Sequence, residues 1–171
     1  MLGLSGGLDS VALLHILLAL RDQRPFALRA VHVHHGLSPH ADDWADFCAR
    51  LCALHAVELS IHRVRIAPDD AAGIEAAARR ERQRIFAALD ADFLLTAHQQ
   101  NDQAETLLLQ LLRGAGPKGL AAMAELQGRP GWRAAQLRPL LGVTRGGLLD
   151  YAQSHGLNWV DDESNRDTRY R

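Results

Sequence analysis

The chain has 171 residues, of which 47% are hydrophobic and 23% are charged, and its formal net charge is −1. This composition is that of an ordinary globular domain with a sizeable core, and it excludes a disordered or low-complexity chain. A net charge near zero also excludes a global field that would draw the chain to nucleic acid or membrane, so any such contact requires a local patch or sequence outside this chain.

A strand, a glycine turn and a helix open the chain. The apolar residues 2–4 predict the strand, Asp9 to Leu20 predict the helix, and Ser-Gly-Gly-Leu-Asp-Ser occupies positions 5–10. Such a turn aims backbone N–H groups and a helix dipole at one point, which suits an anion such as pyrophosphate. Gly6 and Gly7 allow close approach of the backbone to phosphates. The motif is neither a Walker A loop nor a dinucleotide fingerprint, and a tight turn with a capping side chain is the alternative.

The polar side chains of this turn match a phosphate site. Ser5 and Ser10 offer hydroxyl donors. Asp9 offers either a helix cap or a carboxylate for a metal ion that is bound to the phosphates.

Strands and helices alternate along the rest of the chain. Periodicity and turn residues predict strands at 26–33, 57–66, 92–97 and 137–140. They predict helices at 42–55, 74–89, 103–113 and 144–155, the last capped by Thr144, and a loop with one short helix at 114–131. In the 103–113 helix the core side is assigned to Leu107, Leu108, Leu111 and Leu112.

This alternation predicts a parallel, three-layer α/β/α sheet domain with right-handed crossovers. Ligands of such sheets bind outside the carboxyl ends of the strands. Three polar clusters follow predicted strands, at 5–10, 34–36 and 98–102, and we expect them to converge.

Two further clusters have both a functional and a structural interpretation. His98 follows a predicted strand, and Asp102 and Glu105 begin the next helix, where they either cap it or hold a metal ion or an ammonium substrate. Arginines at 79, 80, 82 and 84 are typical of a solvated helix face, although Arg79 and Arg82 share a face and can reach polyphosphate.

The remaining candidates are a histidine-rich strand end, an acidic turn and two cysteines. The strand end at 31–36 favours contact with an adenine or pocket shaping over a metal site. The acidic turn at 159–165 is either an exposed loop or a site for a cationic substrate. Cys48 and Cys52 share a helix face and are expected to pack rather than bridge, as in a reducing cytoplasm.

Taken in order, these segments resemble the N-terminal catalytic domain of the bacterial tRNA(Ile)-lysidine synthetase family, within the PP-loop superfamily. The resemblance covers essentially the whole chain. It rests on residues 5–10, 31–37, 75–82, 98–106, 111–116, 138–141 and 161–165. Asn101 stands where the family commonly has Asp, and Gln99 where a second His is frequent.

The resemblance implies a Rossmann-like ATP-binding catalytic domain over residues 1–171, as a fragment whose C-terminal tRNA-binding domains are absent. It implies ATP and Mg²⁺ as cofactors, and as substrates L-lysine and tRNA(Ile) with a CAU anticodon, the tRNA bound weakly by this fragment. The expected reaction adenylates C2 of the wobble cytidine and then joins lysine. The alternatives are a PP-loop enzyme that 2-thiolates tRNA and an ATP-binding module without chemistry. We expect no membrane association and a cytoplasmic location.

The resemblance also assigns residues to the expected site. For ATP it implies Ser5, Gly6, Gly7, Leu8, Asp9, Ser10, Val33 and His34. For catalysis it implies Asp9, Arg79, His98, Asp102 and Arg138. For Mg²⁺ it implies Asp9 and Asp102, and for the lysine ammonium it implies Glu105, Asp161 and Asp162.

Overall fold

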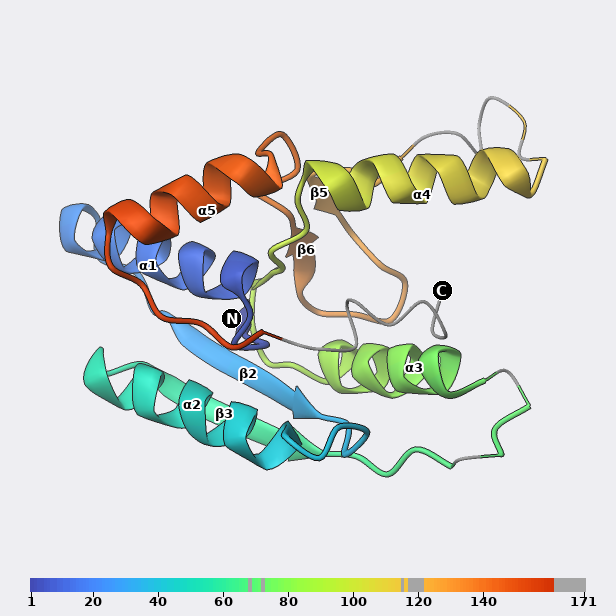
Figure 1. Ribbon diagram of the computed structural model, residues 1–171, viewed down its shortest axis with the longest axis horizontal. Coiled ribbons are helices and arrows are strands. Elements are labelled where there is room, and N and C mark those ends of the chain that lie inside the picture. The colour runs from blue at the N-terminus through green and yellow to red at the C-terminus, as the bar shows by residue number, and fades with distance from the viewer. Residues whose placement is uncertain (68, 72, 115, 117–121, 162–171) are drawn as a thin grey trace.

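A computed structural model describes residues 1–67, 69–71, 73–114, 116 and 122–161 (Figure 1). Its strands are β1 (Leu2–Gly3), β2 (Arg29–His34), β3 (Glu58–Arg63), β4 (Phe93–Leu95), β5 (Leu126–Gln127) and β6 (Ala135–Leu137). Its helices are α1 (Leu8–Gln23), α2 (Ala41–Leu54), α3 (Ile74–Ala87), α4 (Gln100–Leu112) and α5 (Arg145–Ser154).

The described strands form one sheet in the order β3-β2-β1-β4-β6-β5. All neighbouring strands are parallel except β5, which pairs antiparallel with β6 at the edge. The short β1 lies at the centre, where Leu2 pairs with both Ala30 of β2 and Leu95 of β4. The polar segments that follow β1, β2 and β4 therefore leave the sheet at one edge, side by side.

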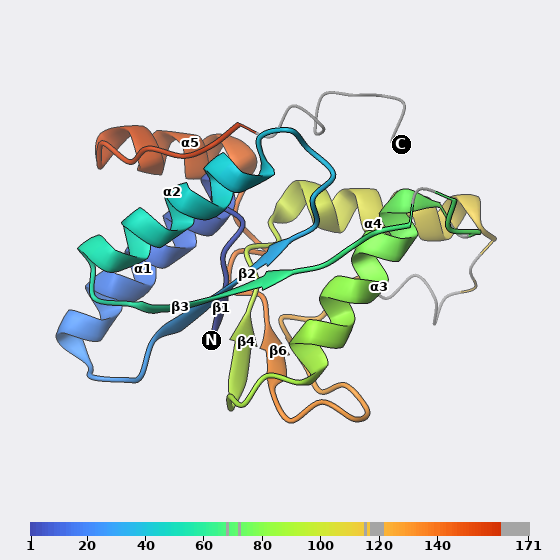
Figure 2. The same cartoon turned by 90° about the horizontal axis from the view of Figure 1, so that it is seen from below.

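Helices cover both faces of this sheet (Figures 1 and 2). One core lies between the sheet and α1, α2 and α5, and includes Leu13, Cys48 and Leu148. The second core lies under α3 and includes Ile85, Phe86 and Leu94. The three-layer α/β/α prediction is confirmed.

The region after α4 differs from the prediction. The last strand of the parallel set is β6 at Ala135–Leu137 rather than 137–140, and β5 is an additional strand. Residues 122–131 contain β5 and turns but no helix, and the other residues of the predicted short helix fall largely outside the described part of the chain. The side chain of Gln103 explains part of this path, because its amide accepts from Met123 N and donates to Met123 O, both at 2.8 Å.

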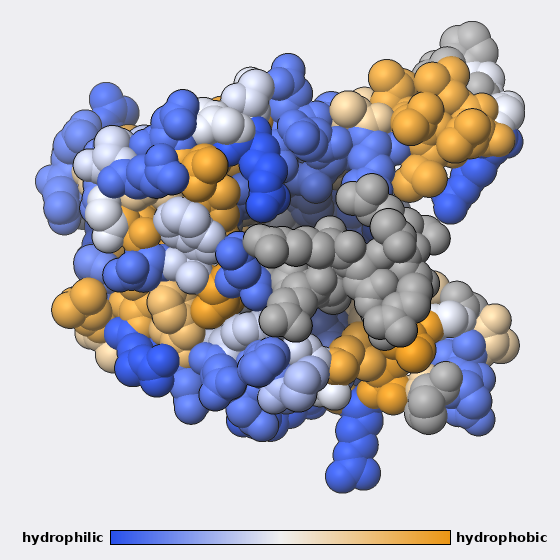
Figure 3. All heavy atoms as spheres, in the orientation of Figure 1, coloured by the Kyte–Doolittle hydropathy of each residue, from blue (hydrophilic) through white to orange (hydrophobic). Residues whose placement is uncertain are grey.

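The predicted core face of α4 is wrong. The helix begins at Gln100, three residues earlier than expected, and has no buried residue. Leu107, Leu108, Leu111 and Leu112 are 37, 57, 51 and 76% exposed. Figure 3 shows an apolar patch over the end of α4, which projects beyond the sheet. Helical spacing predicts that such a face exists, but it does not say whether a neighbouring element lies against it.

Candidate active site

The turn between β1 and α1 is shaped by a glycine whose replacement would strain the backbone. Gly6 has φ +91°, a left-handed conformation that side chains disfavour. A Cβ at this position would lie 3.0 Å from Val160 Cγ2 and 3.2 Å from Cys48 Sγ. Val160 N also donates to Gly6 O at 3.0 Å, so the segment after α5 lies against the turn.

The two serines of the turn hold its shape. Ser10 Oγ donates to Gly7 O at 3.0 Å and accepts from Gly6 N at 3.2 Å. Because the Ser10 proton is used in this way, Ser5 donates in the 3.0 Å contact between the two hydroxyls. The serines therefore keep the backbone of the turn in place for the N–H groups that begin α1.

The first turn of α1 presents backbone donors and one acidic side chain. Within the described part of the chain no side chain caps the helix at Gly7, and its first N–H groups face a ligand or water there. The side chain of Leu8 is buried in the core, so only the backbone of this residue can contact a ligand at the turn. Oδ1 of Asp9 is buried and has no hydrogen-bond partner within the described part of the chain. Burial raises the pKa of Asp9, Arg145 lowers it, and the charge of Asp102 adds to the rise.

The end of β4 supplies His98 and Asp102. Nδ1 of His98 lies 2.9 Å from Thr96 Oγ1. Burial lowers the pKa of His98 to about 4, and nearby arginines add to this although Asp102 opposes it. Asp102 Oδ2 accepts from Gln99 N at 2.8 Å, so the carboxylate caps α4. The capping and functional interpretations of Asp102 are therefore compatible, since its charge also acts on Asp9 and His98.

The arginines of α3 divide into two pairs. Arg80 donates to Asp70 at 2.7 Å, and Arg84 donates to Glu81 at 2.9 Å, as expected for a solvated helix face. Arg79 and Arg82 instead lower the pKa of His98, so their positive charges reach the centre of the site.

The end of β6 holds a buried arginine that is clamped by polar partners. Arg138 is 2% exposed and donates to Ala124 O at 2.7 Å and to Gln136 Oε1 at 2.8 Å. Arg129 Nε also donates to Gln136 Oε1, at 3.0 Å. No role for Arg129, Gln136 or Thr96 was predicted from the sequence. A single Gln or Thr in an apolar strand forms no motif, and its only signal is a polar residue at a position that is expected to be buried.

The two histidines at the end of β2 have different surroundings. His34, a predicted ATP-binding residue beside the partly buried Val33, lies 3.2 Å from both Asp42 Oδ1 and Arg63 Nη1. His35 has a buried Nδ1 with no partner among the described residues. Burial, followed by the charge of Arg82, lowers the pKa of His35 to about 4. Of the two, His35 is therefore the histidine that interacts with an arginine of α3, Arg82, whereas His34 lies beside Arg63 of β3.

The predicted lysine-binding residues are less fully described. Glu105 is exposed on α4, one turn after Asp102. Asp161 is exposed and directly follows Val160, the residue bonded to Gly6 of the turn. Asp162 lies outside the described residues.

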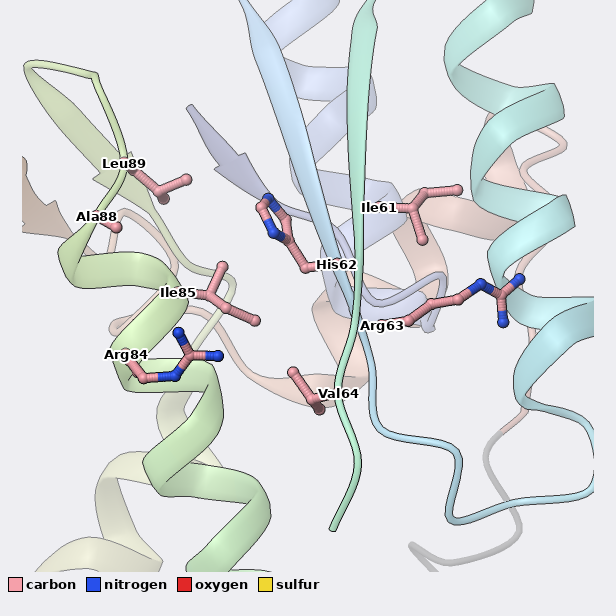
Figure 4. Close-up of a pocket in the computed structure, with 8 residues that line it drawn as sticks. All are labelled: Ile61, His62, Arg63, Val64, Arg84, Ile85, Ala88 and Leu89. Carbon is pink, nitrogen blue, oxygen red and sulfur yellow. The ribbon is translucent and has the colours of Figure 1, made fainter.

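A groove of about 390 Å³ on the flank of the domain is separate from this site (Figure 4). It lies between β3 and α3, with His62 and Val64 directed toward Ile85 and Leu89, while Arg63 points the other way, to α2. Its lining contains no carboxylate and none of the predicted site residues.

The family model of the PP-loop domain matches residues 1–171. The chain belongs to the PP-loop family. Similar proteins include the tRNA(Ile)-lysidine synthases of Azoarcus sp. (strain BH72), 52% identical over 169 residues, and Escherichia coli O157:H7, 50% identical over 169 residues. These alignments cover 98 and 97% of this chain but 37 and 38% of the relatives.

A solved structure supports the same fold. The U34-tRNA thiolase NcsA from Methanococcus maripaludis superimposes with a TM-score of 0.73 at 22% identity, covering 94% of this chain and 58% of that chain. The PP-loop chain described here spans less than two fifths of the length of its curated relatives. Among its described helices, none has the length and apolarity that crossing a bilayer requires.

Proposed function

We propose that the protein is a tRNA(Ile)-lysidine synthase and that this domain binds ATP and activates the wobble cytidine. The observation that carries the proposal is that the charge of Asp102 acts both on Asp9 in the glycine turn and on His98. The charges of Arg79, Arg82 and Arg138 act on His98 as well. Identity near 50% over nearly the whole chain to lysidine synthases supports the same assignment. Its setting would be the cytoplasm, where bacterial tRNA is modified.

The proposed reaction has two balanced steps. The C2 oxygen of cytidine attacks the α-phosphorus of ATP; an O–P bond forms and the bond to pyrophosphate breaks. The ε-amine of lysine then attacks C2, a C–N bond forms, and AMP leaves with the oxygen while the amine loses its proton. Positioning of the three substrates and stabilisation of the leaving anions supply most of the rate in such a scheme.

The residues of the site have distinct proposed tasks. The turn of residues 5–10 would hold the phosphates through the N–H groups that begin α1, since Gly6 N and Gly7 N already donate to Ser10 and Ser5. Val33 and His34 would lie beside the adenosine. Arg79 and Arg138 would stabilise the leaving pyrophosphate, since planar guanidinium groups bind phosphate oxygens with paired hydrogen bonds.

The surroundings of Asp9 fit a divalent cation. Its Oδ1 is buried without a partner among the described residues, and burial and the charge of Asp102 raise the pKa of its carboxyl. A Mg²⁺ ion takes oxygen ligands, usually one or two carboxylates with substrate phosphates. Asp9 and Asp102 would hold Mg²⁺, which when bound neutralises phosphate charge.

The lysine ammonium is assigned to the acidic residues that border this centre. Glu105 follows Asp102 on α4, and Asp161 follows the residue bonded to the turn. Asp162 belongs to the same proposal through its sequence position alone. Recognition of tRNA is assigned to sequence beyond residues 1–171, because this PP-loop domain has a net charge of −1.

The thiolation alternative is disfavoured by the cysteines. Cys48 and Cys52 are both buried on α2, and burial raises their pKa values to about 12 and about 11. Thiols with such pKa values are poor nucleophiles. An ATP-binding module without chemistry would account for the turn, but it offers no reason for His98 and Asp102 to lie with the arginines.

Incorporation of radiolabelled lysine into tRNA(Ile) with a CAU anticodon tests the proposal. The whole protein with ATP and Mg²⁺ is expected to transfer label to this tRNA and to release AMP and pyrophosphate in equal amounts. A tRNA with a CAU anticodon that carries methionine serves as the control substrate. Incorporation of sulfur, or ATP binding with no label transferred, would overturn the assignment.

A further inference from the structure

A chain of buried and partly buried hydrogen bonds runs from two arginines to the ring of His98. Gln136 of β6 and Thr96, just after β4, are 4 and 6% exposed. Gln136 Oε1 accepts from Arg129 Nε at 3.0 Å and from Arg138 Nη2 at 2.8 Å. Gln136 Nε2 lies 3.1 Å from Thr96 Oγ1, which lies 2.9 Å from His98 Nδ1.

The chemistry of these groups sets the direction of each bond. A guanidinium can only donate, so the amide atom that faces Arg129 and Arg138 must be the oxygen. The Gln136 NH₂ group therefore faces Thr96 and donates to its hydroxyl. The single Thr96 proton cannot go back to that NH₂ group, and the other contact of Oγ1 within the described structure is His98 Nδ1.

We infer that Gln136 is a positioning residue which, acting through Thr96, fixes His98 as the tautomer that carries its proton on Nε2. In this arrangement Nδ1 accepts the Thr96 proton and cannot hold one of its own without leaving a buried hydroxyl proton unpaired. Unpaired buried donors are costly, so the relay also opposes protonation of the ring. The lowered pKa of His98 agrees with a neutral ring near pH 7.

The tautomer decides what His98 can do in the reaction. A neutral ring with its proton on Nε2 offers one hydrogen-bond donor and no free basic nitrogen. His98 would therefore donate to a phosphate or leaving-group oxygen rather than remove a proton from lysine. This consequence rests on the proposed function, whereas the tautomer itself does not.

Nitrogen NMR of the whole protein labelled with [¹⁵N]histidine tests the tautomer directly. Long-range couplings to the ring C–H protons distinguish protonated from unprotonated ring nitrogens, and H98Q assigns the signals. We expect Nε2 protonated and Nδ1 unprotonated at neutral pH without substrate. A protonated Nδ1 in the wild type would overturn the inference, whether or not the protein makes lysidine.

Two substitutions test the relay itself. In Q136E the carboxylate has only acceptors, so Thr96 must donate to it and accept from His98; the proton is expected on Nδ1. T96V removes the relay and should give a mixture of tautomers, while T96S keeps the wild-type pattern as the matched control. Unchanged signals from the buried His32, whose Nδ1 lies 2.8 Å from Leu4 O, report that each variant folds. A wild-type tautomer in T96V would overturn the role of the relay, even if Q136E fails to fold.

Kinetics of the same variants separate positioning from binding. Q136E is expected to lower kcat for lysine transfer by about 100-fold, the lower end of the range for one positioned acid–base group, while the KM for ATP changes less than about threefold. T96S should retain most of the activity. If Q136E moves the proton to Nδ1 but leaves kcat unchanged, His98 is not the donor that we infer.

Discussion

Helices α1 and α4 look alike in sequence and behave differently in the fold. Both begin at the carboxyl edge of the sheet, both are rich in leucine, and both carry an acidic site candidate in the first turn, Asp9 and Asp102. Yet α1 buries eight residues and α4 buries none. Leucine content predicts a helix in both places, but burial depends on where the helix lies relative to the sheet.

The two helices are also held at their N-termini in different ways. No described side chain caps α1, which is fixed by its packing against the sheet and α5. The first turn of α4 is capped by Gln99 and Asp102. Burial of one leucine contributes about 1.5–3 kcal/mol, whereas a cap contributes about 1 kcal/mol. The stability of the domain should therefore depend far more on α1 than on α4.

The largest expected effect compares one leucine from each helix. Leu14 of α1 is 1% exposed and Leu112 of α4 is 76% exposed. L14A should lower the free energy of unfolding by about 2–5 kcal/mol, because it removes buried methyl groups and leaves a cavity. L112A should change it by less than about 0.5 kcal/mol. Urea denaturation of the two variants measures both values, and equal losses would show that α4 is packed after all.

The next effect concerns the acidic residue of α1. D9N should reduce ATP turnover at least about 100-fold, as loss of a main electrostatic group at a reacting centre does. It should not lower stability, because burial and Asp102 already raise the pKa of Asp9 and so disfavour its charge. D22N, at the exposed end of the same helix, is the matched control. Wild-type turnover in D9N would show that the acidic residue of α1 does not act in the site.

The sequence predicted most of what local pattern and chain order determine. Strand–helix alternation was enough for the three-layer fold, and the polar ends of β1, β2 and β4 were enough to bring the three candidate clusters to one edge of the sheet. The core face of α4 and the strand β5 could not be predicted, because both depend on the path of distant segments. The role of Gln136 could not be predicted either, because its partners Arg129, Arg138 and Thr96 come from separate parts of the chain.

The next prediction concerns how the stability of the domain depends on pH. It tests whether His98, in the segment before α4, is buried as the core around α1 is. The pKa of His98 is about 4 in the fold against an ordinary 6.5, so the unfolded chain binds more protons between these values. The stability that His98 contributes is present above pH 6.5 and is lost as the pH falls toward 4. We expect a loss on the order of 2 kcal/mol across this window that is absent in H98Q. Denaturant titrations of both proteins at several pH values measure the difference, and identical pH profiles would contradict the burial of His98.

The smallest effect concerns the cap of α4. Gln99 Oε1 accepts from Asn101 N at 3.1 Å, and the residue is 4% exposed. Because no buried side chain holds α4, loss of this bond in Q99A should weaken the helix locally by about 1 kcal/mol, with about fivefold faster exchange of its amide hydrogens. T144A removes the corresponding bond to Gly147 N in α5, whose Leu148 is buried. Hydrogen exchange in α5 should respond less, because packing as well as the cap keeps that helix closed. Equal acceleration in both helices would show that packing does not compensate for a lost cap in this fold.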